Sequence, residues 1–203
     1  MIESSPELAL LRFAELAEGS GVRWIVGGSA GLRLRGAPLD RPPRDLDIYA
    51  DAAGLRALHE RLTAFAEDAP AWSETDRYRS LLSHYRLADV KVELVGDFVV
   101  RARDSVYRTE VDGELYDRGD RCEIGSREVR LVPLGHELIF NLLRERSDRA
   151  HTAAELIRRA PERHLPALLA LLDRYEIAAA VKDEALALAA GKSASAWMGE
   201  ERA

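Results

Sequence analysis

The sequence predicts an α/β (α+β) protein, with a mixed central sheet and flanking helices followed by a C-terminal lobe of helices. Up to Pro133, short apolar runs bounded by Gly, Pro and Asp alternate with amphipathic stretches. Beyond Pro133 only helical periodicity remains. The 203 residues, 47% of them hydrophobic, suit one domain with an appended lobe or two small domains. We therefore expect a domain over residues 1–132 and a helical lobe over 133–203.

The first expected elements are a helix, a short strand, a tight turn and a second helix. The Ser-Pro-Glu sequence that begins at Ser5 is typical of a helix start, and apolar residues follow it at helical spacing. Residues 22–26 form an apolar run typical of a buried strand. Gly27 and Gly28 indicate a turn, after which Ser29 is expected to cap a short helix.

The middle of the chain continues the alternation of strands and helices. Residues 37–43 contain three prolines, which forbid regular strand pairing and predict a loop. Residues 45–50 are expected to form a strand, and residues 52–66 carry the apolar stripe of an amphipathic helix. Residues 79–87 and 90–95 look like two strands of a hairpin.

The remaining elements are short strands and then helices. Further strands are expected near residues 99–101, 106–111 and 128–131. Leucine-rich periodicity predicts helices over residues 135–146, 150–160, 163–174 and 182–190, and the last dozen residues are expected to be loose.

Composition narrows the classes of function. The net charge of -6 argues against a general nucleic-acid binder, although a local basic pocket is compatible with it. Cys122 is the single cysteine and cannot form an internal disulfide, which favours a reducing compartment. No apolar run reaches the roughly 18 residues of a membrane span, and the N-terminus lacks the pattern of a signal peptide. We expect a cytoplasmic protein without a membrane partner.

Two aspartates stand out in the strand over 45–50. Residues i and i+2 of a strand point to the same side, so Asp45 and Asp47 should project together while Leu46 and Ile48 face the core. Two neighbouring carboxylates repel each other unless a cation lies between them or one of them is protonated, and Mg²⁺ prefers such oxygen ligands. The alternative is a solvated strand edge. The strongly apolar neighbours and the glycine turn upstream favour a metal site.

The turn at Gly27, Gly28 and Ser29 is a candidate phosphate site. Glycines let a backbone approach a ligand closely, a helix start offers N–H groups, and Ser29 adds a hydroxyl. Arg44 precedes the aspartates and could neutralise phosphate charge. The alternatives are that the glycines serve only the turn and that Arg44 balances charge at the rim.

A third acidic ligand is expected if two metal ions bind. Glu93 lies between apolar residues on a strand expected beside the first, and it is the best candidate. Asp89 and Asp97 share its strand parity but rank lower, because one lies at a turn and the other follows a glycine. The alternative for Glu93 is a solvent-facing acid on an edge strand. His84, on the preceding strand, is interpreted as an ordinary surface or core histidine.

These motifs together resemble the nucleotidyltransferase superfamily that includes DNA polymerase beta. The pieces Trp-Ile-Val-Gly-Gly-Ser-Ala from Trp24 and Arg-Asp-Leu-Asp-Ile from Arg44 are most similar to small bacterial members, of the antibiotic-modifying or toxin type. The resemblance implies that Gly28 and Ser29 hold the triphosphate of an NTP such as ATP. It also implies that Asp45, Asp47 and Glu93 bind two Mg²⁺ ions, or Mn²⁺, while NMP is transferred to a hydroxyl and pyrophosphate leaves.

The resemblance leaves the acceptor and the activity open. A small-molecule hydroxyl is favoured by the acidic charge, while an RNA or protein acceptor is the alternative. The chain departs from toxin-type relatives at Asn141, where a lysine is expected, and the gap from Gly28 to Asp45 is long. Two other hypotheses are a nucleotide- or partner-binding module without turnover and a toxin-type enzyme with an antitoxin partner.

Overall fold

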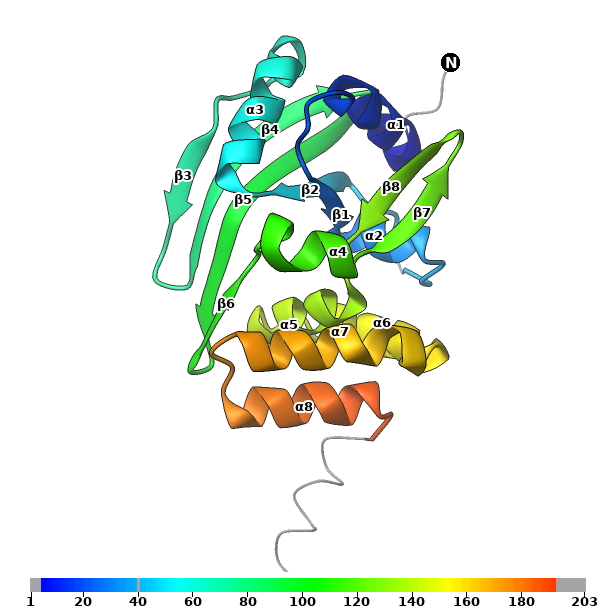
Figure 1. Ribbon diagram of the computed structural model, residues 1–203, viewed down its shortest axis with the longest axis vertical. Helices are drawn as coiled ribbons and strands as arrows, with labels where there is room; N and C mark the ends of the chain where they lie inside the picture. The colour runs from blue at the N-terminus through cyan, green and yellow to red at the C-terminus, as the bar shows by residue number, and fades with distance from the viewer. Residues whose placement is uncertain (1–4, 40, 193–203) are drawn as a thin grey trace, which may run out of the picture. The chain divides into compact units, whose positions relative to one another are not determined.

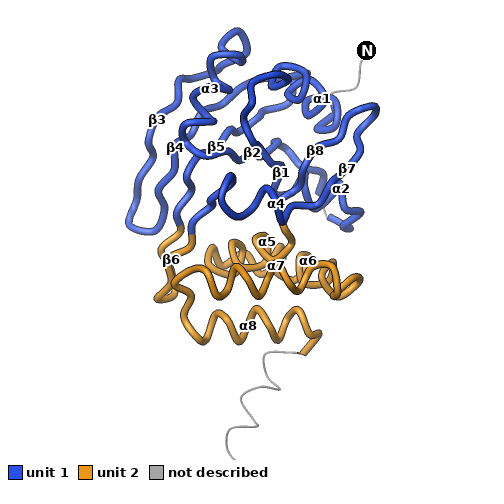
Figure 2. Tube along the Cα trace, viewed as in Figure 1, with its two compact units in different colours: residues 1–99, 108–132 blue, residues 100–107, 133–203 orange. Residues whose placement is uncertain are grey.

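The computed structural model describes residues 5–39 and 41–192. The chain separates into two compact units, coloured blue and orange in Figure 2. Residues 1–99 and 108–132 make up the first unit, and residues 100–107 and 133–203 the second. The expected boundary at residue 132 places residues 100–107 with the sheet, whereas the structure groups them with the helices. As a division into domains, the boundary stays a prediction.

The expected α/β class is confirmed. The ribbon in Figure 1 shows a mixed sheet accompanied by helices and followed by a helical region. Helices and turns of the first unit are α1 (Pro6–Ala17), α2 (Gly28–Leu34), α3 (Ala52–Leu62), η1 (Thr63–Phe65), η2 (Val111–Leu115) and α4 (Tyr116–Arg118). Its strands are β1 (Ile25–Gly27), β2 (Asp45–Ala50), β3 (Ala71–Glu74), β4 (Tyr78–Leu87), β7 (Asp120–Ile124) and β8 (Arg127–Leu131), with most of β5 (Val90–Ala102).

The sheet has the strand order β3-β4-β5-β2-β1-β8-β7, and β6 (Ser105–Arg108) pairs with β5. The centre is mixed, since β2 runs parallel to β5 and antiparallel to β1. A two-residue turn joins β4 to β5, and both of its residues, Ala88 and Asp89, have the positive φ that such a hairpin turn requires.

Helices α1 and α3 pack on one face of this sheet. Leu10 and Phe13 of α1 share a buried cluster with Leu58 of α3 and with Leu46 and Ile48 of β2. The start of α1 follows the expected pattern, because the Oγ atom of Ser5 accepts a hydrogen bond of 3.1 Å from the N–H of Leu8. The opposite face of β2 is left for polar side chains.

Over its described residues, which end at 192, the second unit contains four helices and a hairpin. The helices are α5 (Leu134–Leu143), α6 (Ser147–Arg159), α7 (Pro161–Arg174) and α8 (Ala179–Ala189). The hairpin is formed by the end of β5 and by β6, and the Oγ atom of Ser105 accepts a hydrogen bond from the N–H of Ala178. All four helices match the expected ones to within a few residues. The residues expected to be loose, 193–203, lie outside the described residues.

Some elements differ from the expectation. Strands β3 and β7 and the helical turns η2 and α4 were not expected. All four residues of β3 are exposed, so no apolar alternation marks it. The strand predicted from residue 22 begins at Ile25, and β5 runs unbroken through Gly96. The predicted Ser29 cap is wrong, because α2 begins at Gly28, so that Ser29 lies inside the helix, and no side chain caps it.

Candidate active site

Strand β2 divides its side chains between the two faces of the sheet. Leu46 and Ile48 are fully buried, whereas Asp45 and Asp47 are only partly covered. This alternation is the period of two expected of a strand, with Leu46 and Ile48 on the α1 and α3 side. The two carboxylates therefore project together from the opposite face, as expected.

Strand pairing brings Glu93 to these aspartates. In the parallel pair of β2 and β5, Asp47 lies opposite Glu93 and Asp45 lies opposite Lys91. On the other side of β2, Asp47 lies opposite Gly27 of β1. Opposed residues of neighbouring strands point to the same face of the sheet. The register thus places Asp45, Asp47, Lys91 and Glu93 on one polar face, which we call the acid patch.

Gly28 at the start of α2 is packed against Asp47. Its φ of +61° lies in the left-handed region, which residues other than glycine rarely adopt. A Cβ atom added at Gly28 would lie 2.9 Å from Cγ of Asp47 and would overlap its carboxylate. Only glycine therefore allows the Asp47 carboxylate to lie against the first residue of the helix.

Sequence reasoning missed Lys91. Its Nζ atom lies 2.6 Å from Oε1 of Glu93, and both side chains are partly exposed. The bond to Glu93 raises the pKa of Lys91 most; burial opposes the shift, and the charges of Glu93, Asp45 and Glu67 add to it. Lys91 lies two residues before Glu93, so the strand period could have revealed it.

His84 also lies beside Glu93 and is held by Asp68. The His84 Nε2 atom is 3.8 Å from Oε1 of Glu93, and its Nδ1 atom is 2.5 Å from Oδ2 of Asp68. The other Asp68 oxygen accepts a hydrogen bond of 2.7 Å from the N–H of His84. Burial raises the pKa of Asp68, but the bonds from the His84 ring and backbone outweigh it and leave this pKa lowered. His84 is thus an oriented neighbour of the acid patch.

The other expected site residues frame the same region. Gly27 pairs with Asp47, Ser29 is partly covered in the first turn of α2, and Arg44 is exposed at the bend before β2. The Oδ1 atom of Asp97 accepts a hydrogen bond from the N–H of Ala52, which ties it to the start of α3. Its lower rank as a ligand agrees with this structural contact.

The donor set of the acid patch suits a hard divalent cation, since Asp45 and Asp47 offer carboxylate oxygens on one face. Within residues 5–39 and 41–192, however, no three acidic, His or Cys side chains converge closely enough to hold a metal ion together. The Glu93 carboxylate is bonded to Lys91 instead. The two aspartates therefore carry donor atoms of the kind such an ion prefers, and the Glu93 carboxylate would have to leave Lys91 to join them.

Comparison with solved structures assigns this architecture. A Thermotoga maritima protein provisionally assigned as a nucleotidyltransferase matches with a TM-score of 0.59 and 22% identity, covering 74% of this chain and 91% of its own. The antibiotic-resistance factor ANT(2″)-Ia matches with a TM-score of 0.50 and 14% identity, covering 83% of this chain and 91% of its own. The chain has the nucleotidyltransferase fold. No protein-family model and no curated protein matches the sequence.

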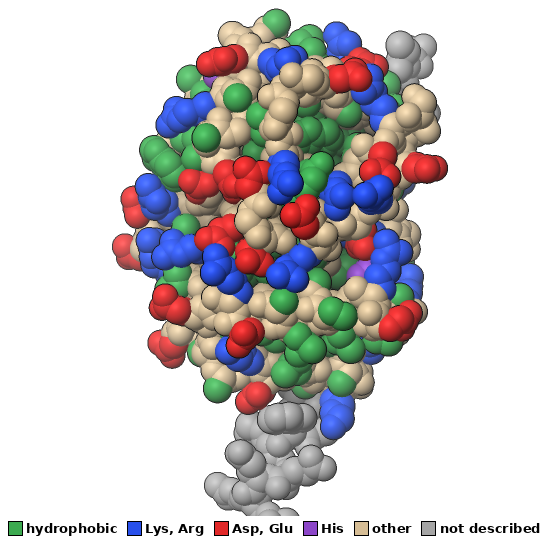
Figure 3. Space-filling view, in the orientation of Figure 1, with side chains coloured by type: hydrophobic (Ala, Val, Ile, Leu, Met, Phe, Trp, Pro, Cys, Tyr) green, Lys and Arg blue, Asp and Glu red, His purple; other side chains and the backbone are tan. Residues whose placement is uncertain are grey.

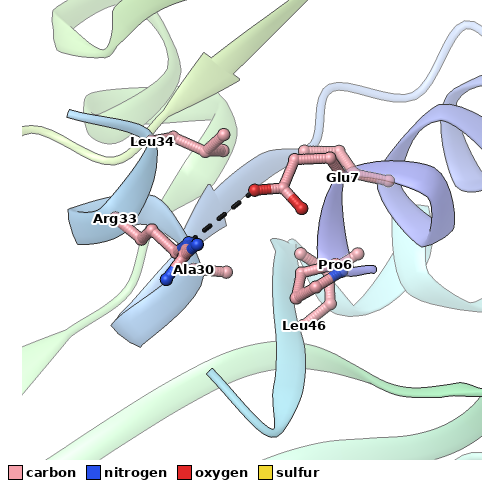
Figure 4. A pocket seen from close by; sticks show the side chains of 7 residues that line it. Pro6, Glu7, Ala30, Arg33, Leu34 and Leu46 are labelled. Atoms are coloured by element: carbon pink, nitrogen blue, oxygen red, sulfur yellow. Dashed lines mark ion pairs between the residues drawn. The ribbon is translucent and has the colours of Figure 1, made fainter. Parts of the chain in front are cut away.

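In this nucleotidyltransferase fold, a small hollow lies on the face of β2 that carries Leu46, away from the acid patch. It is lined by Pro6, Glu7, Leu10, Ala30, Arg33, Leu34 and Leu46. Figure 4 shows Arg33 and Glu7 facing each other at this hollow, where they form an ion pair of 3.8 Å. Because strand neighbours point to opposite faces, the hollow does not open onto Asp45 or Asp47.

Asn141 is part of the packing of the helical unit. Its side chain is buried in α5, and its amide donates hydrogen bonds to the backbone carbonyl and to Oε2 of Glu137. Asn141, which stands where a lysine is expected, therefore makes a polar contact inside the helical unit. Among the described residues, no helix is long and apolar enough to cross a membrane.

Proposed function

We propose that this protein is a metal-dependent nucleotidyltransferase that moves NMP from an NTP to a hydroxyl and releases pyrophosphate. The observation that carries the proposal is the position of Asp47. It is packed against Gly28 of the glycine turn and lies opposite Glu93 in the register. The glycine backbone can approach phosphates closely, and the carboxylates suit a metal ion. These two features lie at the same place.

Asp45 and Asp47 would hold a magnesium ion, and Mn²⁺ has the same preference for oxygen ligands. When bound, such an ion would neutralise triphosphate charge and polarise the phosphoryl group under attack. Gly27, Gly28 and Ser29 would approach the triphosphate, and Arg44, exposed at the bend before β2, would contribute positive charge. Glu93 would accept the proton of the acceptor hydroxyl, and it would bind a second ion only once its contact with Lys91 is broken.

A small molecule is the acceptor that we propose. On the face shown in Figure 3, acidic and basic side chains are interspersed, which does not offer a long basic track for nucleic acid. The net charge of -6 points the same way. An RNA acceptor, a protein acceptor and an antitoxin partner are hypotheses, and no contact among the described residues favours any of them. A cytoplasmic location likewise stays a prediction.

The test measures nucleotide binding and pyrophosphate release. The protein is incubated with Mg²⁺, each of the four NTPs and a panel of small molecules that carry hydroxyls. We expect binding of at least one NTP, and pyrophosphate release that depends on the acceptor. Asp45→Asn and Asp47→Asn should reduce the release at least about 100-fold, since each removes a charged metal ligand. Their stability should hold or rise, because carboxylate repulsion is relieved.

Asp89→Asn is the matched control. Asp89 shares the strand parity of Glu93 but is exposed in the turn between β4 and β5, and Asn tolerates its φ of +61°. This variant should keep full activity. The proposal fails if no NTP binds, or if Asp45→Asn and Asp47→Asn leave release unchanged.

A module that binds nucleotide without turnover is the second candidate. Two observations favour it: the bond from Lys91 to Glu93, and Asn141 buried against Glu137 where a lysine is expected. The same assay separates the two candidates. NTP binding that depends on Asp45 and Asp47, without pyrophosphate release for any acceptor, would support the module.

A further inference from the structure

The acid patch already contains one cation. The ammonium of Lys91 is 2.6 Å from Glu93, and Lys91 lies opposite Asp45 in the strand register. Three carboxylates and one ammonium give the patch a formal charge of -2, from three negative charges and one positive. A single divalent ion would balance that charge. Without the ammonium the patch would carry -3 and would call for more than one divalent ion.

The identity of this cation is unusual for the chain. The sequence contains 26 arginines and only three lysines, and Lys91 is the one lysine of the first unit. Lysine presents a compact, hydrated point charge, whereas arginine presents a planar fork. Among side chains, a lysine ammonium is the closest in shape to a small inorganic cation. Lysine is thus used at a place where a metal ion is otherwise expected.

We infer that the Lys91 ammonium takes the place of a second metal ion, so that the nucleotide-free protein binds one divalent cation, at Asp45 and Asp47. A second divalent ion beside Glu93 would be repelled by the ammonium and would have to displace it. The inference rests on the proposed function and specifies its metal requirement.

Removal of the ammonium should change metal binding directly. Lys91→Met keeps an unbranched stem, frees the Glu93 carboxylate and changes the formal charge of the patch from -2 to -3. The probe is Mn²⁺ alone, without nucleotide, titrated calorimetrically and by the paramagnetic resonance signal of free Mn²⁺. We expect one Mn²⁺ per wild-type chain. In Lys91→Met we expect either a second bound ion or affinity raised at least about tenfold.

Two matched variants control for charge. Lys182→Met makes the same change on α8 of the second unit and should bind Mn²⁺ as the wild type does. Lys91→Arg keeps the positive charge and should still bind one ion. The Lys91 side chain is 40% exposed, so a stable fold is expected, and a thermal melt checks it. If Lys91→Met does not fold, Lys91→Gln takes its place.

The outcomes separate this inference from the proposed function. A gain of Mn²⁺ binding in Lys91→Met, absent from Lys182→Met and Lys91→Arg, supports the inference. Two ions in the wild type, or unchanged binding in Lys91→Met, overturns it. If the wild type binds Mn²⁺ and Asp47→Asn does not, the proposed function is still supported even when the inference is overturned. No Mn²⁺ binding in either the wild type or Lys91→Met overturns the metal site and the inference together.

Discussion

Gly28 is the residue on which the geometry of the acid patch depends most directly. Its backbone has a φ of +61°, and its missing side chain leaves room for the carboxylate of Asp47. Gly36 offers a comparison, because its φ is +75° but nothing lies within 4 Å of an added Cβ atom. Both glycines have a positive φ, but only Gly28 has a carboxylate where a side chain would lie.

We predict different costs for the two alanine substitutions. Gly36→Ala should lower the free energy of unfolding by about 1–2 kcal/mol, the cost of a left-handed conformation, and leave nucleotide binding intact. Gly28→Ala should cost about 2–4 kcal/mol, since the Asp47 carboxylate must also move, and should abolish metal and nucleotide binding. Chemical denaturation and Mn²⁺ titration measure both effects. Equal losses in the two variants would contradict the role assigned to the contact with Asp47.

Tyr85 gives a prediction on pH. Its hydroxyl is buried within β4 and lies 2.8 Å from Oγ of Ser83 and 2.8 Å from Nδ1 of His59. Burial raises the pKa of Tyr85 to about 12, against 10.0 for an exposed tyrosine. Between these values an unfolded chain loses the proton while the folded chain keeps it. The Tyr85 contribution to stability is therefore complete below pH 10 and falls as the pH rises towards 12.

The Tyr85→Phe variant tests this dependence. It should cost about 1 kcal/mol at neutral pH, because two hydrogen bonds are lost. Above pH 10 its stability should fall less steeply than that of the wild type, since the group that ionises on unfolding is gone. Denaturant melts at several pH values, with absorbance of tyrosinate as the probe of ionisation, measure the difference. Parallel curves for the two proteins would contradict the raised pKa.

At the scale of the elements, the strands and helices with an apolar period could be predicted, and the charged ones could not. Strand β2 was predictable because Leu46 and Ile48 alternate with aspartates. Strand β3 is exposed at every residue and is held by its pairing with β4, which no local pattern reveals. Strand β7 pairs with β8 in the same way.

The site was predictable to the same extent. The residues on β2 and the glycine turn are close in sequence, and their types suggested the chemistry. Glu93 was expected on a neighbouring strand, and the parallel register places it opposite Asp47. Lys91 could not be predicted as a site residue because no chemical motif requires it. Its role follows from the distance of 2.6 Å between its Nζ atom and Oε1 of Glu93. Ser29 was misjudged as a cap because the helix begins at Gly28.

At the scale of the whole molecule, the question is to which unit the segment 100–107 belongs. It lies within the sequence of the sheet region, yet its contacts within the second unit are specific. Arg103 forms an ion pair of 2.7 Å with Glu184, and the N–H of Val106 donates a hydrogen bond of 2.8 Å to the carbonyl of Glu176. The hydroxyl of Tyr107 lies 2.9 Å from Nδ1 of His136.

We predict that this segment opens together with the helices. Leu168 in α7 and Leu58 in α3 are both fully buried, so Leu168→Ala and Leu58→Ala should each cost about 2–5 kcal/mol within their own unit. Amide hydrogen exchange then reports which unit governs the hairpin. The amide of Val106 should exchange faster in Leu168→Ala and keep its wild-type rate in Leu58→Ala, because its acceptor, the carbonyl of Glu176, belongs to the helical unit. The reverse pattern would assign the hairpin to the sheet and favour a single division of the chain at residue 132.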